Sequence, residues 1–212
     1  MWGTHNTDGF FVAIDGPNGV GKSTLIAAIK NKMETAGYTV CTTKEPTDTK
    51  LGGFIRQFAE NNSGKSLACL VAADRYEHIS SEIIPELKKG ALVITDRYVL
   101  SSLILQGMDG VGNTFILNLN SDIVKPDLQL AVFADEEVLQ KRLTDRMALT
   151  RFERGNQSGK ELSYMELGII ELEKLNVNVM RINNTNNIEA NVERVITFIV
   201  NNWKMYEKIH SV

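Results

Sequence analysis

The sequence lacks the long apolar run and the N-terminal pattern that would place a protein in or across a membrane. No apolar stretch among its 212 residues approaches the roughly 20 residues needed to span a bilayer. The N-terminus, MWGTHNTDG, does not have the basic and then apolar order of a secretory signal peptide. We therefore expect a cytoplasmic protein without a membrane partner.

Cysteine is scarce and the net charge is small. The two cysteines, Cys41 and Cys69, have no CxxC partner and no histidine at metal-ligand spacing. This pattern favours buried, reduced thiols over a disulfide or a metal site. The formal net charge of -3 gives the chain as a whole no attraction for nucleic acid, so we expect no nucleic-acid partner. Any anion that binds must be held by a local cluster of residues.

What the sequence does contain is an alternation of apolar strands and amphipathic helices. Strands are predicted at 10–15, 38–46, 91–96, 128–135 and 178–182. Helices are predicted at 22–36, 51–61, 66–90 with a kink near Pro85, around 101–106, 136–147, 164–175 and 188–205. A loose tail is expected before the first strand, and a loop rich in Gly and Asn between 106 and 128. The alternation predicts an α/β fold, a five-stranded parallel sheet with helices on both faces, in a single domain over 1–212.

Residues 16–24, GPNGVGKST, follow the first predicted strand and match the pattern G-x-x-x-x-G-K-[ST]. In this position glycines allow backbone N–H groups to surround the phosphates of a nucleotide, beside the positive end of the following helix. Lys22 is expected to reach the outer phosphates, and Ser23 to hold Mg²⁺. The motif therefore predicts a nucleotide-binding protein.

The predicted strand 91–96 ends in a second polar pair, Asp96 and Arg97. A carboxylate there can organise a metal shell or an acceptor oxygen, and a guanidinium can bind a phosphate through two N–H groups. The same pair would also suit a plain surface ion pair. A GTPase switch would be expected to carry an NKxD-like segment that reads the base, and this sequence has none.

Arginines recur after the fourth predicted strand. Arg142 and Arg146 are four residues apart on a predicted helix and so share a face, whereas Arg151 and Arg154 fall in the polar segment 147–160. One interpretation is a solvated basic surface. The other is a mobile lid over 147–160, whose arginines stabilise a phosphoryl group during transfer and exclude water.

Six motifs, in order, resemble those of the thymidylate kinase family of nucleoside monophosphate kinases, from Phe11 to about Phe198. They are GPNGVGKST, TKEPTDTKLGGFIR, LVAADRYEH, DRYVLSSLILQG, KPDLQLAVFAD and RLTDRMALTRFE. The resemblance implies that the γ-phosphate of ATP, with Mg²⁺, is transferred to a deoxynucleoside 5′-monophosphate, with dTMP the first candidate. It also implies a homodimer formed through the helices that flank the DRY segment.

The resemblance and the motifs together assign the site residues. Catalytic roles fall to Lys22, Arg97 and Arg151. ATP binding is assigned to Gly16, Gly19, Val20, Gly21, Lys22, Ser23, Thr24, Arg142 and Arg146. Acceptor binding is assigned to Asn18, Glu45, Pro46, Arg56, Val71, Arg75, Arg97, Ser101, Ser102, Leu105 and Gln106. Ser23 and Asp96 are the expected Mg²⁺ ligands.

Three positions near the expected acceptor depart from the family pattern. Asn18 stands where the family has Asp or Glu at the sugar 3′-hydroxyl, Val71 replaces a Phe that stacks on thymine, and Leu105 replaces a Tyr beside the deoxyribose. Two further hypotheses therefore stay open. One is a kinase for a different or modified nucleotide on the same scaffold, and the other is a non-catalytic regulatory protein that binds ATP.

Overall fold

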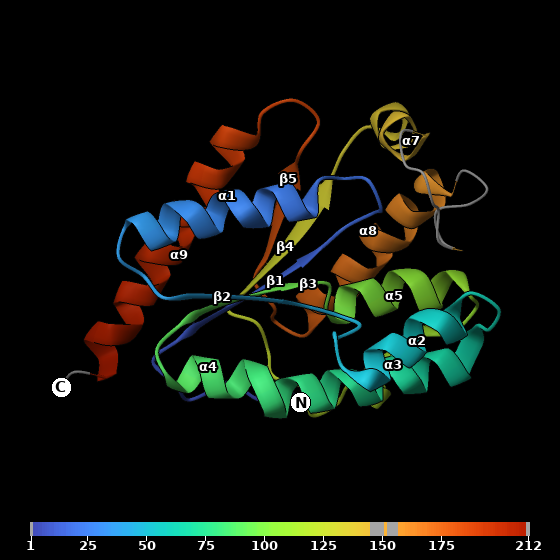
Figure 1. Ribbon diagram of the computed structural model, residues 1–212, viewed down its shortest axis with the longest axis horizontal. Helices are drawn as coiled ribbons and strands as arrows, with labels where there is room; N and C mark the ends of the chain where they lie inside the picture. The colour runs from blue at the N-terminus through green and yellow to red at the C-terminus, as the bar shows by residue number, and fades with distance from the viewer. Residues whose placement is uncertain (1, 145–150, 152–156, 211–212) are drawn as a thin grey trace.

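The computed structural model describes residues 2–144, 151 and 157–210 (Figure 1). The protein is built around five parallel strands, β1 (Phe10–Asp15), β2 (Val40–Lys44), β3 (Leu92–Asp96), β4 (Leu128–Phe133) and β5 (Val179–Asn183). Their order in the sheet is β2-β3-β1-β4-β5, so β1 lies in the middle, between β3 and β4. The predicted α/β fold with a five-stranded parallel sheet is confirmed.

Alternate residues of β1 point to opposite faces of the sheet, and each face has its own hydrophobic core. Val12 and Ile14 pack in the core under α1 (Lys22–Thr35) and α9 (Ile188–His210). Phe11 and Ala13 pack in the core of the opposite face. Because helices cover both faces, most residues of the central strands β1, β3 and β4 are apolar and buried, as the sequence indicates.

The second face is covered by α3 (Gly64–His78), α4 (Ile84–Lys88), α5 (Val99–Met108), α6 (Asn113–Leu119) and α8 (Ser158–Lys174), and α2 (Lys50–Ala59) packs against α3 (Figure 1). The long helix predicted over 66–90 is interrupted by a π-helical turn, η1 (Ile79–Ile83), that leads into Pro85. Proline has no N–H to give to the preceding turn, and a change of helical register accommodates it. α7 (Glu136–Thr144) follows β4.

Two predicted irregular segments are ordered instead. The segment expected to be a loop rich in Gly and Asn contains α6, whose Ile116 is buried in the second core. The N-terminal residues are not a loose tail, because the Gly3 N–H donates to the Ile123 carbonyl oxygen at 3.3 Å. His5 is buried, with Nε2 2.7 Å from Asp127 Oδ2. These partners are distant in the sequence, so local composition could not indicate them.

The cysteine prediction holds in part. Both thiols are free, as expected. Cys41 is half-buried, but Cys69 is exposed, because it lies on the outer side of α3 while Leu67 and Ala68 face inward.

The carboxyl ends of the parallel strands meet at one edge of the sheet, and there β1 continues into the loop 16–21. Ligands of open α/β sheets bind at this edge. Among the residues that the structure describes, no helix is long and apolar enough to cross a membrane.

Candidate active site

The loop 16–21 between β1 and α1 has the geometry of a phosphate cradle. Gly19 and Gly21 have φ angles of 79° and 93°, which glycine adopts without strain. A Cβ at Gly16 would lie 2.4 Å from the Val132 carbonyl oxygen, so the loop is packed directly against β4. The loop leads into the N-terminus of α1, where unpaired N–H groups and the helix dipole favour an anion.

Lys22 is the first residue of α1, and its ammonium group is buried. Nζ donates to the carbonyl oxygens of Gly16 at 2.9 Å and Pro17 at 3.0 Å. Burial, followed by the nearby charge of Arg97, lowers the pKa of Lys22 from 10.5 to about 7, against the opposing effect of neighbouring carboxylates. A phosphate bound in the cradle would favour the charged form of this group.

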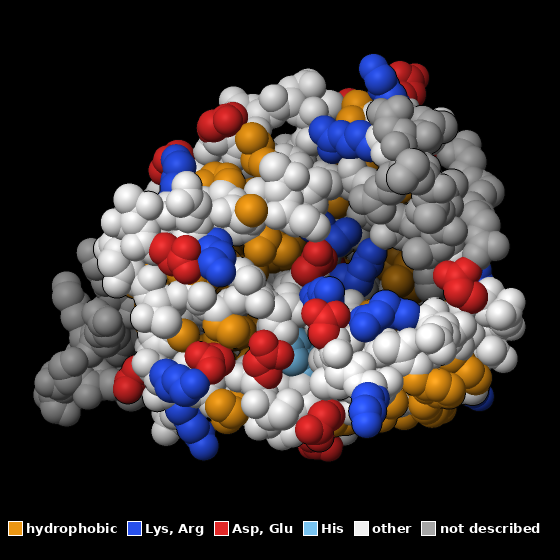
Figure 2. Space-filling view, viewed as in Figure 1, with side chains coloured by type: hydrophobic (Ala, Val, Ile, Leu, Met, Phe, Trp, Pro, Cys, Tyr) orange, Lys and Arg blue, Asp and Glu red, His pale blue; other side chains and the backbone are white. Residues whose placement is uncertain are grey.

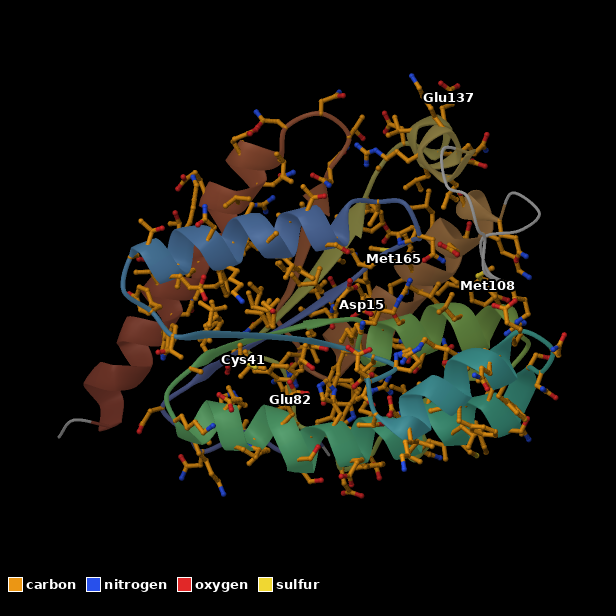
Figure 3. All side chains as sticks on the ribbon, in the orientation of Figure 1. Asp15, Cys41, Glu82, Met108, Glu137 and Met165 are labelled. Atoms are coloured by element: carbon orange, nitrogen blue, oxygen red, sulfur yellow. The ribbon has the colours of Figure 1, made fainter. Side chains whose placement is uncertain are left out.

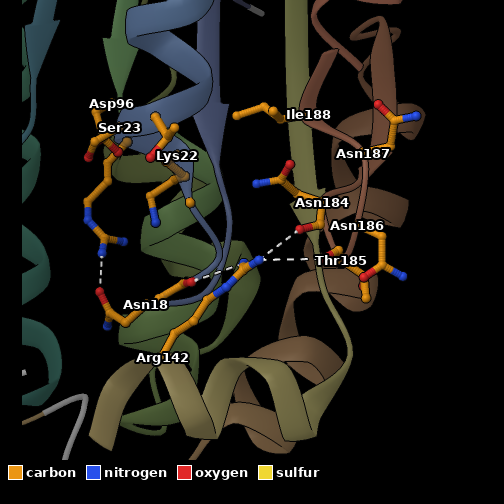
Figure 4. Close-up of a pocket in the computed structure, with 14 residues that line it drawn as sticks. Asn18, Lys22, Ser23, Asp96, Arg142, Asn184, Thr185, Asn186, Asn187 and Ile188 are labelled. Atoms are coloured by element: carbon orange, nitrogen blue, oxygen red, sulfur yellow. Dashed lines mark hydrogen bonds between the residues drawn. The ribbon is translucent and has the colours of Figure 1, made fainter. Parts of the chain in front are cut away.

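A cavity of about 660 Å³ lies over the loop, and Figure 4 shows its lining. The residues assigned to ATP that line it are Gly19, Gly21, Lys22, Ser23, Thr24 and Arg142. Arg142 reaches over the loop from α7, with Nη1 donating to the Val20 carbonyl oxygen at 3.3 Å. The Val20 side chain is buried in the first core, so this residue contributes its backbone alone. Arg146 lies outside the described residues.

One wall of this cavity was not predicted from the sequence. It is the loop between β5 and α9, where Asn184, Thr185, Asn186 and Asn187 line the cavity (Figure 4). Asn184 ties the loop to the cradle, since its Nδ2 donates to the Val20 carbonyl oxygen at 2.8 Å. The run NNTNN directly after the fifth predicted strand was the available signal.

Ser23 and Asp96 face the same cavity from α1 and from the end of β3 (Figure 4). Asp96 Oδ1 is buried and has no hydrogen-bond partner among the described residues. A buried oxygen without a partner is costly, and carboxylate and hydroxyl oxygens suit Mg²⁺, which commonly shares its ligands between protein and phosphates. The described part of the chain has no group of three His, Cys, Asp or Glu side chains able to hold a metal alone. The donor set therefore fits a Mg²⁺ ion that accompanies a bound nucleotide.

A second cavity, of about 230 Å³, adjoins the first. All eleven residues assigned to the acceptor line it, namely Asn18, Glu45, Pro46, Arg56, Val71, Arg75, Arg97, Ser101, Ser102, Leu105 and Gln106. They come from the cradle, the loop after β2, the turn between β3 and α5, and the helices α2, α3 and α5. Asn18 and Arg97 line both cavities, so the two spaces meet at these side chains.

Arg97 stands at this junction in an unusual backbone conformation, with φ of 75°. Its Nη2 donates to Asn18 Oδ1 at 2.6 Å, and its Nη1 donates to Ser101 Oγ at 3.3 Å. Figure 2 shows Lys and Arg side chains gathered between α1 and α2 on this face of the molecule. The junction is thus suited to phosphate groups.

One part of the second cavity carries Arg75 and Gln106. Arg75 is 1% exposed, and its guanidinium donates to Glu45 Oε2, Asn120 Oδ1 and Ser102 Oγ at 2.9, 2.7 and 3.0 Å. Gln106 is 3% exposed, and its Oε1 has no partner within the described residues. The Arg75 guanidinium can donate a hydrogen bond, and Gln106 Oε1 can accept one, so together they can recognise the polar edge of a ligand.

Glu161 is a site residue that was missed in the sequence. It is buried in the first turn of α8, and its Oε2 accepts from the Asn18 N–H at 3.0 Å. Its Oε1 accepts from Asn18 Nδ2 at 3.4 Å. Burial raises the pKa of the Glu161 carboxyl, while the Asn18 N–H and the charges of Arg97 and Lys22 act against this increase. Glu161 therefore places a carboxyl group beside the cradle position where Asn18 has none.

Arg56 and Pro46 shape the outer part of the second cavity. Arg56 Nη1 donates to the carbonyl oxygens of Pro46 at 2.7 Å and Thr47 at 2.9 Å. The Thr47 N–H donates in turn to the buried Asp74 Oδ2 at 2.8 Å. The loop after β2 is thereby fixed from both α2 and α3.

Arg151, the expected lid arginine, also lines the second cavity, and it is not among the described residues around the first. Its Nη1 and Nη2 donate to the two carboxylate oxygens of Asp109 at 2.7 and 2.9 Å, and its Nε donates to the Ala59 carbonyl oxygen at 2.7 Å. The guanidinium is thus held between the ends of α2 and α5. Most of the expected lid, including Arg154, lies outside the described residues.

The sequence of this chain matches known proteins over most of its length. A family model described as thymidylate kinase matches residues 14–195. A probable thymidylate kinase of Caldivirga maquilingensis is 41% identical over 148 residues, which are 68% of this chain and 72% of that protein. A thymidylate kinase of Caldicellulosiruptor saccharolyticus is 40% identical over 143 residues, which are 64% of this chain and 69% of that protein. A probable thymidylate kinase of Pyrococcus abyssi is 34% identical over 182 residues, which are 81% of this chain and 89% of that protein. With most of its length matched by the family model and by these relatives, this chain belongs to the thymidylate kinase family.

Proposed function

We propose that the protein transfers the γ-phosphate of ATP to dTMP, giving ADP and dTDP. The observation that carries this proposal is the pair of cavities that meet at Asn18 and Arg97. The first cavity contains the phosphate cradle, and the second contains the buried pair Arg75 and Gln106. Two bound nucleotides would bring their phosphate ends together at the junction.

The donor side is formed by the cradle, Arg142 and the loop 184–187. The backbone N–H groups of the cradle and Lys22 would bind the ATP phosphates, and Ser23 and Asp96 would hold Mg²⁺. The ion, when bound, offsets phosphate charge and orients the phosphates. Arg142 and the amide side chains of the loop lie where the remainder of the nucleotide would extend.

The acceptor side suits thymine because its polar groups are complementary to that base. Gln106 Oε1, buried without a partner among the described residues, accepts from the N3–H of thymine. The guanidinium of Arg75 donates to a ring carbonyl. Val71 and Leu105 contribute an apolar wall where the family pattern has aromatic rings, so here the base is held by ordinary apolar packing and hydrogen bonds.

Transfer of the phosphoryl group does not require the protein to form a covalent intermediate. The acceptor phosphate is already an anion, so no strong general base is needed, and positioning with charge neutralisation dominates. Arg97 holds the acceptor phosphate in line with the ATP γ-phosphate. Arg151 stabilises the charge on the transferring group, for which it must exchange Asp109 for phosphate.

A panel of acceptors tests this function. ADP release from Mg-ATP is measured with dTMP, dUMP, dCMP, dGMP, UMP and modified pyrimidine monophosphates. Efficient turnover of dTMP above the others supports the proposal. Activity on another member alone would replace dTMP as the acceptor, and ATP binding without any turnover would favour the regulatory protein.

The lid over 147–160, the homodimer and the cytoplasmic location stay predictions. We propose that the enzyme is a homodimer, which light scattering coupled to size-exclusion chromatography would test directly. A mass equal to the 23.6 kDa of one chain would contradict it.

A further inference from the structure

A buried carboxylate outside the assigned site lies directly behind Arg97. Asp15 is the last residue of β1, is 0% exposed, and lies between the sheet and the start of α5 (Figure 3). Its Oδ1 accepts from the N–H groups of Tyr98 at 3.0 Å and Ser101 at 2.9 Å, and also from the Ser101 hydroxyl. These groups form the entry to α5, where a negative charge is favourable.

The other oxygen of this carboxylate is held by an amide in the middle of the sheet. Gln129 on β4 is 0% exposed, and its Nε2 donates to Asp15 Oδ2 at 2.9 Å. The same nitrogen also donates to the Ala13 and Leu130 carbonyl oxygens, while Oε1 has no partner in the part of the chain that is described. A buried amide with an unpaired oxygen is an unfavourable choice for a central strand on stability grounds alone. Its evident structural effect is to fix the Asp15 carboxylate.

The residue enclosed by these contacts is Arg97, between Asp96 and Tyr98. Its φ of 75° lies in the left-handed region, which costs a side chain other than glycine of the order of 1 kcal/mol and persists when neighbours impose it. The Arg97 N–H donates to the Ile14 carbonyl oxygen at 2.9 Å, and Thr95 Oγ1 donates to the Arg97 carbonyl oxygen at 2.9 Å. Asp15 fixes the next N–H along the chain, that of Tyr98.

The side chain of Arg97 is connected to the same carboxylate. Ser101 Oγ donates its proton to Asp15, which leaves a lone pair to accept from Arg97 Nη1 at 3.3 Å. Arg97 Nη2 then donates to Asn18 Oδ1 at 2.6 Å. A carboxylate accepts hydrogen bonds and does not donate them, so Gln129 and Ser101 must both donate to Asp15. The Ser101 oxygen is then the acceptor in its hydrogen bond with Arg97.

We propose that Asp15 and Gln129 are positioning residues that hold the turn and the guanidinium of Arg97 at the junction of the two cavities. Neither needs to touch a nucleotide. The proposal deepens the proposed function, because it relies on Arg97 binding the acceptor phosphate there.

Two substitutions at Asp15 separate hydrogen bonding from charge. Asp15→Ala removes every acceptor, and we expect kcat to fall at least about 10-fold, with a raised KM for dTMP and a KM for ATP within about twofold of the wild type. Asp15→Asn keeps an oxygen for both N–H groups and the hydroxyl and loses only the contact with Gln129, whose Nε2 stays on the Ala13 and Leu130 carbonyl oxygens. We expect it to keep at least about a third of the wild-type kcat.

Gln129→Met and Val12→Ala complete the series. Gln129→Met leaves the N–H contacts of Asp15 in place, and its kcat should fall, but by no more than that of Asp15→Asn. Val12→Ala makes a cavity in the core on the same strand as Asp15 but contacts none of these groups, so it should lower stability without changing kcat. Thermal unfolding of each variant checks that the protein is folded.

Several results would overturn the proposal. Equal losses in Asp15→Asn and Asp15→Ala would show that the charge matters rather than the hydrogen bonds, and an unchanged kcat in folded Asp15→Ala would show that neither does. If Asp15→Ala does not fold, an unchanged kcat in Gln129→Met would overturn the proposal.

A structural measurement separates this proposal from the function on which it rests. In crystals without nucleotide, Asp15→Ala should lose the positive φ of Arg97 and its contact with Asn18, and Asp15→Asn should keep both. If both persist in Asp15→Ala, the proposal is wrong. If the wild type does not phosphorylate dTMP, the proposed function fails, but this structural comparison still decides whether Asp15 positions Arg97.

Discussion

Replacing Lys22 by Met should remove a strong pH dependence from the stability of the nucleotide-free protein. The ammonium group is buried, and its pKa falls from 10.5 in the unfolded chain to about 7 in the folded protein. Between these two values the unfolded chain binds one more proton at Lys22 than the folded protein does. Stability therefore increases with pH across this range, and this contribution is absent in Lys22→Met.

The expected size follows from the two pKa values. Each pH unit well inside the range contributes about 1.4 kcal/mol, and the contribution begins only near pH 7. Between pH 6 and pH 9 the free energy of unfolding of the wild type should rise by about 2 to 3 kcal/mol relative to Lys22→Met. Loss of the two hydrogen bonds to Gly16 and Pro17 shifts the whole curve of the variant, but it does not change the slope.

Urea unfolding at pH 6, 7, 8 and 9, followed by circular dichroism, gives the two curves. Lys30→Met is the matched control, because Lys30 is on the same helix with its side chain 40% exposed. It should keep the wild-type slope. Parallel curves for the wild type and Lys22→Met would refute the reasoning, since they would mean that burial in the empty cradle does not perturb the ammonium group.

Three further predictions concern activity. Gln106→Leu should raise the KM for dTMP by about 10-fold and leave the KM for ATP unchanged, because it removes one acceptor from the base pocket; equal changes in both constants would contradict the assignment. Asp96→Asn should raise the Mg²⁺ concentration for half-maximal activity by about 10-fold, measured by titration at fixed ATP, since a charged ligand is lost; an unaltered Mg²⁺ curve would exclude Asp96 as a ligand. Arg151→Ala should lower kcat by about 100-fold, whereas Asp109→Asn should leave kcat within about threefold, because phosphates replace Asp109 as the partner of Arg151 in the reacting complex. Equal losses in this pair, measured by ADP release, would mean that Arg151 acts only through Asp109.

The features that the sequence predicts well are those encoded in adjacent residues. The cradle could be predicted because its glycines, Lys22 and Ser23 lie close together in the sequence, where a strand ends and a helix begins. The strands β1, β3 and β4 could be predicted because nearly all of their residues are buried and most are apolar. Four of the family motifs contain the eleven residues assigned to the second cavity, so the resemblance identified them although they are far apart in the sequence.

The features that were missed depend on which distant segments meet. Glu161 reaches Asn18 across 143 positions, and Gln129 reaches Asp15 only because β4 pairs with β1. A buried glutamine within an apolar strand was visible in the sequence as an exception, but its partner was not. The same applies to the N-terminal residues, whose polar groups are paired with the segment before β4.

The two cores on opposite faces of the sheet have a consequence for how such an enzyme can change. On the first core, α1 supplies Lys22, Ser23 and Thr24 to the ATP side and α9 supplies Ile188, whereas α3 and α5 on the second core supply much of the acceptor side. Substitutions within one layer, such as those at Val71 and Leu105, can alter recognition of one nucleotide while the sheet shields the other site from the repacking. The sheet thus acts as a partition, so that the specificity for each substrate can evolve nearly independently, and only the few side chains at its edge must serve both.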